Sequence, residues 1–138
     1  MTMPEIEPID PRYLALKAVM MPRDTNPFGT IFGGVLLSYV DQAGAVGGRH
    51  MIRRAGWPDR VIVTVAINRV EFHQPVFVGD VVSFWTRVRR VGKTSITMHV
   101  DVEAERDGEA VSLTEAELTY VAVDLLKGPP APIPIRGE

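Results

Sequence analysis

The residues best suited to chemistry lie along one apolar stretch, which runs from Val35 to about Ala55. Gly33 and Gly34 stand at its entrance. If the stretch is a helix, its first backbone N–H groups lack acceptors and the positive end of the dipole lies there. Such an entrance can polarise a carbonyl group and hold the oxyanion that forms when that carbonyl is attacked. A glycine pair also caps helices or permits close packing, which is its commoner role.

Asp41 is the second candidate on this stretch. It lies seven residues after Gly34, two helical turns further along and roughly 10 Å down the axis on a similar face. A carboxylate is costly to bury among apolar residues unless it is partnered or used in chemistry. The alternative is an aspartate on the one polar edge of the helix, together with Ser38 and Gln42. The pattern alone favours neither interpretation.

Two further groups of polar residues lie outside the stretch. Asn26 precedes Pro27 in the loop 22–34, where its amide could orient a water or a carbonyl, although such residues more often make an Asx turn. A turn between two expected strands gathers cations, hydroxyls and glycine, which suit a phosphate-bearing ligand. Its residues are Arg87, Arg89, Arg90, Gly92, Lys93, Thr94 and Ser95. A solvated charged hairpin is the alternative interpretation.

Composition and motifs exclude several other chemistries. The 138 residues fit one domain, 1–138, and are 46% apolar with a net charge of −2, so no basic excess indicates nucleic acid. There is no cysteine, and the three histidines show no metal-ligand spacing, so we expect no metal site. The serine elbow, the P-loop and the dinucleotide fingerprint are absent. No signal peptide or membrane span is recognisable, and we expect a cytoplasmic protein.

Periodicity and turn signals predict one helix and five strands. The helix should end near Ala55, because Arg49, Arg53 and Arg54 precede Gly56. Val and Ile enrichment, period-two alternation and turn residues predict the strands. They cover 13–21, 60–72, 81–90, 95–105 and 109–123, with a bulge near Thr114 and Glu115 in the last. Residues 1–12 should form a loose leader and 125–138 a proline-rich, non-strand tail.

This element order predicts an α+β fold in which an antiparallel sheet curls around one long helix. The helix is apolar on most sides, so we expect it to be buried rather than to lie on a surface. Gly44, Gly47 and Gly48 each cost about 1 kcal/mol relative to alanine in a helix, which indicates close approach of a strand or another subunit.

Taken together, an ordered series of segments between residues 14 and 124 resembles the bacterial acyl-CoA thioesterases of the hotdog superfamily, relatives of the brain-type acyl-CoA hydrolases. The series begins with Met21 to Gly29, Ile31 to Gly34, Leu36 to Ser38 and Asp41. It continues with Val63 to Ala66, Phe72, Pro75 to Val76 and Val78 to Val82. It ends with Val91 to Ser95 and Thr119 to Asp124.

The resemblance implies a long helix wrapped by a curved antiparallel sheet, and hydrolysis of an acyl-CoA thioester to a free fatty or other carboxylic acid and CoA. It also implies a homodimer with active sites at the subunit interface, which often assembles into a hexamer as a trimer of dimers. Asp41 would act as general base or nucleophile, and Asn26 would face the aspartate of the other subunit. The backbone N–H of Gly33 or Gly34 would hold the thioester oxygen.

The resemblance also assigns the rest of the substrate, and no cofactor is expected because CoA is part of the substrate. The pantetheine arm would run along Thr64 and Val65, and the turn with Arg90, Gly92, Lys93, Thr94 and Ser95 would meet the CoA phosphates. Two departures from the family pattern concern the length of the acyl chain. They are His73-Gln74 before Pro75, and the polar pair Asn68-Arg69.

Two other functions are alternatives to hydrolysis. A dehydratase or hydratase of the same fold would have a catalytic histidine near the helix entrance, where this loop has Asn26 to Gly29 and no histidine. A non-catalytic acyl-CoA binding or sensing module would keep the CoA turn and tolerate the loss of Asp41. Because both features are present, catalysis is favoured.

Overall fold

The computed structural model describes residues 11–126 and 130–137. Its long elements begin and end within two residues of the predicted bounds. In chain order they are β1 (Tyr13–Val19), the short 3-10 helix η1 (Pro22–Asp24), α1 (Gly33–Arg54), β2 (Val61–Phe72), β3 (Val81–Val91), β4 (Ser95–Arg106), β5 (Glu109–Asp124) and β6 (Ala131–Pro132). The first ten residues of the expected leader lie outside the described residues.

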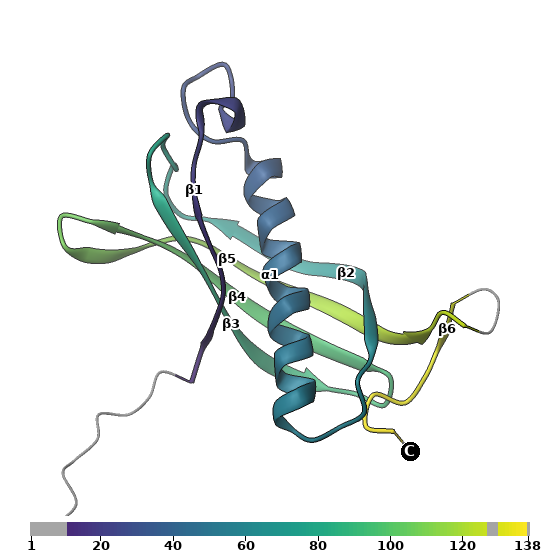
Figure 1. Ribbon diagram of the computed structural model, residues 1–138. Coiled ribbons are helices and arrows are strands. Elements are labelled where there is room, and N and C mark those ends of the chain that lie inside the picture. Colours follow the sequence, from purple (N-terminus) through teal and green to yellow (C-terminus); the bar gives the residue numbers. More distant parts are fainter. Residues whose placement is uncertain (1–10, 127–129, 138) are drawn as a thin grey trace, which may run out of the picture.

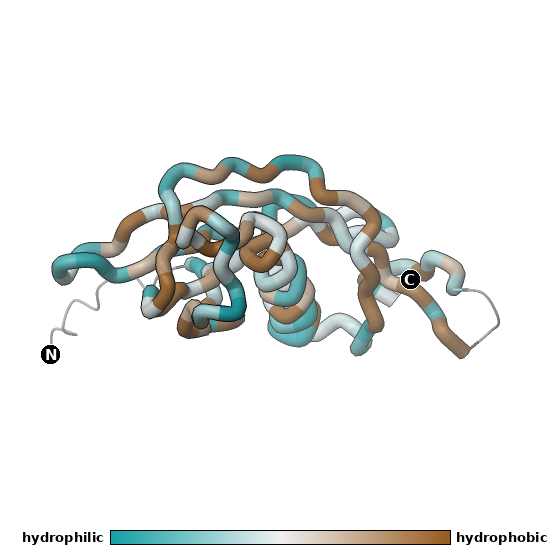
Figure 2. Tube along the Cα trace, turned by 90° about the horizontal axis from the view of Figure 1, so that it is seen from above, coloured by the Kyte–Doolittle hydropathy of each residue, from teal (hydrophilic) through white to brown (hydrophobic). Residues whose placement is uncertain are grey.

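The strands form one antiparallel sheet in the order β1-β3-β4-β5-β2, and β6 pairs with β5. The sheet curves around α1, which lies across its concave side (Figure 1; Figure 2). The predicted α+β class and the predicted wrapping of the helix by the sheet are therefore both confirmed. The two strands that end the row, β1 and β2, are the edges of this sheet in the single chain.

The core lies between α1 and the inner face of the sheet. The buried residues of α1 recur every three or four positions and make one stripe, as expected for a helix packed on one side. They are Leu36, Val40, Ala43, Gly44, Gly47, Gly48 and Ile52. The opposite side of α1, with Ser38, Gln42 and Val46, is exposed in the single chain. For the single chain, the expectation of a buried helix is wrong, because one curved sheet can cover only one side of α1.

The glycines inside α1 have the predicted role of admitting strand side chains. A Cβ at Gly44 would overlap the hydroxyl of Tyr120 on β5, and a Cβ at Gly47 would lie 2.6 Å from Cβ of Thr86 on β3. At Gly48 the nearest atom is Cδ1 of Ile62 on β2, at 3.0 Å. Close packing of strands on the helix therefore requires glycine at positions 44 and 47.

The predicted bulge on the last strand is also present. The β4–β5 register passes from Val102 opposite Thr114 to Glu103 opposite Ser112, which leaves Leu113 unpaired. The Leu113 carbonyl instead accepts hydrogen bonds from the backbone N–H groups of His73 and Gln74, at 2.8 and 3.3 Å. The bulge thus fastens the chain just after β2 to the sheet.

The C-terminal tail differs from the prediction. Proline was expected to keep it out of the sheet, yet β6 pairs with Val123 and Asp124 of β5. Proline is tolerated there because β6 is only two residues long and lies at an edge. Ile135 then inserts its side chain into the core and is fully buried.

Candidate active site

Asp41 lies in the middle of α1, where two strands supply hydrogen-bond donors to it. The Thr64 hydroxyl on β2 donates to its Oδ1 at 2.6 Å. The Tyr120 hydroxyl on β5 lies 3.3 Å from the same Oδ1 and donates to the Asp41 backbone carbonyl at 2.8 Å. The carboxylate therefore has hydrogen-bond partners, which reduces the cost of placing it among apolar residues.

Tyr120 is the residue of this group that sequence reasoning did not assign. Its side chain is fully buried, and burial, the Asp41 charge and the hydrogen bond to Asp41 all raise the pKa of its hydroxyl. It therefore stays protonated and acts as a donor toward Asp41. Gly44 on α1 leaves space for a bulky side chain, and this could have indicated a residue such as Tyr120. The sequence does not give the position of β5 relative to α1, so it does not show which bulky residue fills that space.

Val65 interrupts the pairing of β2 with β5 next to Thr64. Thr64 is opposite Tyr120 and Ala66 is opposite Thr119, so Val65 is an extra residue in a β-bulge. Bulges redirect the side chains around them and are frequent beside active sites. Val65 is 56% exposed and directly follows Thr64, the residue that donates to Asp41, which leaves this part of β2 open to a ligand.

The entrance of α1 lies at Gly33, two residues before the predicted start of the helix at Val35. The residue before it, Phe32, provides no side-chain cap, so the first N–H groups are not satisfied by a side chain. The entrance adjoins a groove of about 370 Å³ with mainly apolar walls, which include Ile31, Leu36, Phe72, Pro75 and Val76. Asp41 is roughly 10 Å further along the axis from Gly34, so the two features of one chain do not meet at one atom.

Asn26 makes a local Asx-type turn, which is the alternative to a functional role. Its Oδ1 accepts hydrogen bonds from the N–H groups of Phe28 at 2.9 Å and Thr30 at 3.1 Å, and its Nδ2 donates to the Thr30 hydroxyl at 2.7 Å. An amide nitrogen carries two donors. A functional role for Asn26 toward another subunit stays a prediction.

The structure separates the residues assigned to the CoA turn. Gly92 and Lys93 line one hollow of about 420 Å³ together with Val91, Pro134 and Arg136. Arg90 lines another hollow with Asn68, Arg89, Thr97, Glu117 and Thr119. Thr94 and Ser95 shape the turn, since the Ser95 carbonyl accepts from the Gly92 N–H and the Thr94 carbonyl from the Ala122 N–H, both at 2.8 Å.

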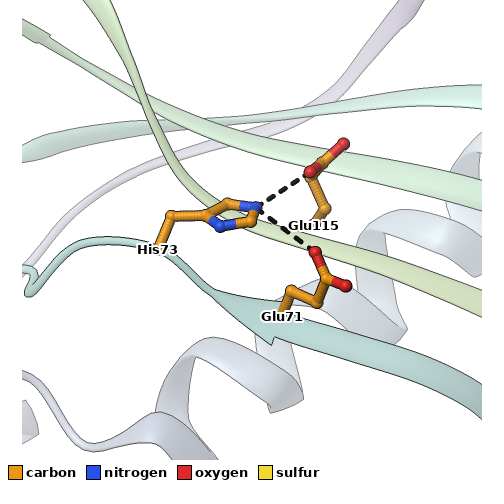
Figure 3. A group of neighbouring side chains, drawn as sticks. All are labelled: Glu71, His73 and Glu115. Atoms are coloured by element: carbon orange, nitrogen blue, oxygen red, sulfur yellow. Dashed lines mark hydrogen bonds and ion pairs between the residues drawn. The ribbon is translucent and has the colours of Figure 1, made fainter.

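The outer face of the sheet brings together histidines and carboxylates that are far apart in the sequence. His73 Nε2 lies 2.8 Å from Glu115 Oε2 and 3.9 Å from Glu71 Oε2, and Figure 3 shows its ring between them. His99 Nε2 lies 2.9 Å from Asp101 Oδ1 and 3.6 Å from Glu115 Oε1. Both sets have metal-ligating side chains within 4.8 Å of one another, a proximity that sequence spacing did not predict.

Three arginines lie beside this cluster. Arg69, Arg87 and Arg89 line a hollow of about 260 Å³ that also contains Glu115 and His99. Arg69 binds Glu71 with two of its nitrogens, and Glu71 is the main cause that raises the pKa of Arg69. Positive charges so close to the carboxylates oppose binding of a further cation, so we interpret the cluster as an ion-pair network.

A long helix laid across the concave side of a curved antiparallel sheet defines the hotdog class of proteins. Residues 28–111 match the thioesterase superfamily model. The acyl-CoA thioester hydrolase YciA of Salmonella typhimurium is 38% identical over 129 residues, which cover 90% of this chain and 92% of that protein. The chain belongs to the thioesterase superfamily, and its relatives are acyl-CoA thioester hydrolases.

Solved structures agree with this assignment. Cj0915, a hexameric hotdog fold thioesterase of Campylobacter jejuni, superposes with a TM-score of 0.76 at 40% identity, covering 91% of this chain and 92% of that one. HI0827, a hexameric broad specificity acyl-coenzyme A thioesterase, superposes with a TM-score of 0.73 at 36% identity, covering 88% of this chain and 80% of that one.

Within the described residues, no helix has the length and apolar character needed to span a bilayer.

Proposed function

We propose that this protein hydrolyses acyl-CoA thioesters to a free carboxylic acid and CoA, and that the Asp41 carboxylate drives the reaction. The observation that carries the proposal is the placement of Asp41, whose Oδ1 accepts the Thr64 hydroxyl at 2.6 Å while Tyr120 lies behind it. The Thr64 hydroxyl holds the carboxylate from one strand, and the Tyr120 hydroxyl holds the helix backbone at the same residue from another. Such fixed orientation is what a general base or a nucleophile requires.

The reaction follows from the groups present, with water as the other reactant. In the general-base route, Asp41 takes a proton from water as the oxygen attacks the thioester carbonyl. The C–S bond then breaks, and the CoA thiolate leaves and is protonated. In the nucleophilic route, the carboxylate attacks the carbonyl directly, and the C–S bond breaks with loss of the CoA thiolate. Water then hydrolyses the resulting anhydride, which releases the acid and restores the Asp41 carboxylate. Neither route invokes a cofactor.

The oxyanion site must come from a different subunit than the attacking carboxylate. Reacting atoms have to approach within about 3–3.5 Å, whereas the Gly34 N–H and Asp41 of one chain are separated by roughly 10 Å along the axis. A second subunit can bring its own helix entrance and its Asn26 toward Asp41. The apolar groove beside the entrance, with Phe72 and Leu36, would then hold the acyl chain.

The edge strand β2 is the surface that suits this assembly. Its exposed apolar residues Val61, Val63, Val65 and Ile67 lie on the strand that carries Thr64. An unpaired apolar edge favours strand pairing with another chain. The solved relatives Cj0915 and HI0827 are hexameric, and we propose the same assembly, built from dimers, for this protein. Light scattering should then give a mass near six times 15.2 kDa.

A cytoplasmic location is part of the same proposal, because the chain contains no cysteine. Disulfides are typical of oxidising compartments, so a cysteine-free chain is compatible with a reducing one.

The activity is tested by thiol release from a panel of acyl-CoAs, from acetyl to palmitoyl and including aromatic thioesters. We expect release from at least one member, and the best substrate identifies the acyl class. Binding of CoA without release from any thioester would contradict hydrolysis and would instead indicate an acyl-CoA binding module.

The composite site is tested by mixing two inactive variants, Asp41→Asn and Asn26→Ala. A mixed dimer contains one site with both wild-type residues, so re-assembly of equal amounts should restore about a quarter of wild-type activity. If Asn26 served only its own chain, each site of the mixed dimer would carry one defect and no activity would return.

A further inference from the structure

The C-terminal segment 130–137 is built into the structure beside the turn between β3 and β4. The Ile133 N–H donates to the Ala122 carbonyl and the Ile135 N–H to the Lys93 carbonyl, each at 2.9 Å. The Ile135 side chain is fully buried in the core. The backbone position of the next residue, Arg136, is therefore fixed relative to Lys93.

Arg136 and Lys93 line the same hollow of about 420 Å³. The Arg136 guanidinium lies 5.1 Å above the ring of Trp57, a contact that orients the planar group and leaves its edges open to hydrogen bonding. Arg60 supports the same wall, since its Nε donates to the Pro134 carbonyl at 3.2 Å. The hollow thus has one cation on the turn and one on the tail.

Neither cation is neutralised within the part of the chain that the structure describes. Lys93 and Arg136 form no ion pair with a carboxylate there, whereas Arg89 is paired with Glu117 at 3.4 Å. Two unpaired positive charges that face one hollow attract a ligand with negative charge. A guanidinium offers a planar fork of donors that matches phosphate oxygens.

We propose that Arg136, rather than Arg90, acts with Lys93 to bind the phosphate groups of the CoA moiety. The family resemblance assigns Arg90 to the phosphate site together with Lys93, but Arg90 lines a different hollow in the structure. The tail therefore supplies a residue that selects CoA thioesters over thioesters without a nucleotide. This proposal rests on the proposed hydrolysis of acyl-CoA.

The experiment compares wild type, Arg136→Gln and Arg136→Lys on two substrates with one acyl group. One substrate is the acyl-CoA and the other is the acyl-pantetheine thioester, which has no nucleotide or phosphate. We expect Arg136→Gln to raise KM for the acyl-CoA on the order of tenfold, with kcat and the kinetics on acyl-pantetheine unchanged. Arg136→Lys, which keeps the charge, should recover part of the loss.

The matched control is Lys17→Gln, which removes one exposed positive charge from β1 and should leave both substrates unaffected. Calorimetric binding of CoA to the same variants tests the phosphate contact even if no thioester is hydrolysed, so the two proposals can fail separately. An equal change of KM on both substrates, or no change on either, would overturn the assignment of Arg136.

Discussion

Replacing Gly44 with alanine should damage the site that holds Asp41, although the substitution favours the helix. The new methyl group would overlap the Tyr120 hydroxyl and lie 3.0 Å from Cζ of the same ring. Because Tyr120 is fully buried between α1 and its neighbours on the sheet, the ring has little room to retreat. Its hydroxyl would have to leave the Asp41 carbonyl that now accepts it at 2.8 Å.

The size of the effect follows from three contributions. Alanine in place of glycine normally stabilises a helix by about 1 kcal/mol. Overpacking in a filled core costs about 1–3 kcal/mol. A buried hydroxyl that loses its acceptor costs a further 1–3 kcal/mol or so. Gly44→Ala should therefore lower the free energy of unfolding by about 1–5 kcal/mol, and it should reduce kcat because Asp41 loses a partner.

The assay is denaturant unfolding of Gly44→Ala, Tyr120→Phe and the double variant at one protein concentration, with thiol release measured in parallel. Removing the hydroxyl removes the worst overlap, so Gly44→Ala should cost less in the Tyr120→Phe background. Gly34→Ala is the stability control, because nothing lies within 4 Å of its added Cβ. Wild-type stability of Gly44→Ala, or the same cost in both backgrounds, would refute this reasoning.

Three further predictions concern single contacts. Thr64→Val removes the hydroxyl that donates to Asp41 Oδ1 and should lower kcat roughly tenfold without unfolding the protein, as measured by thiol release and circular dichroism. Burial alone would raise the pKa of Asp80, but hydrogen bonds from Arg106 and the Phe77 N–H and the Arg106 charge lower it. The stability that Asp80 contributes is then present above the unfolded pKa of about 3.9 and is lost as pH falls through the lower folded value. The difference in free energy of unfolding between wild type and Asp80→Asn, measured in denaturant titrations, should therefore become smaller between neutral pH and about pH 3. Ile135→Ala should cost about 2–5 kcal/mol in the same titrations, and a negligible cost would mean that the tail does not dock as described.

Local patterns were sufficient to predict the main elements. The proline-free apolar run with basic residues and Gly56 at its end predicted α1, and period-two alternation predicted β4 and β5. The presence of Gly44 and Gly47 inside the helix correctly indicated close packing, because glycine destabilises a helix and is expected there only where a neighbouring side chain needs the space.

Contacts between distant segments were not predictable in the same way. The donor from Tyr120 to Asp41 spans 79 residues, and it depends on the register of β5 against the helix. Arg90 and Lys93 are three residues apart, yet they line different hollows. Proline content is a local signal and predicted a tail outside the sheet, whereas burial of Ile135 and pairing with β5 decide the position of the tail.

The most direct test of the central claim is the kcat of Asp41→Asn on the best acyl-CoA of the panel, beside the control Asp107→Asn. Asp107 lies in the turn between β4 and β5 at φ 52°, a conformation that asparagine tolerates, so that variant should match wild type. If Asp41 is the base or nucleophile, its replacement should lower kcat at least about 100-fold while the assembly and its CoA affinity remain intact. A kcat near that of wild type would contradict the assignment of Asp41.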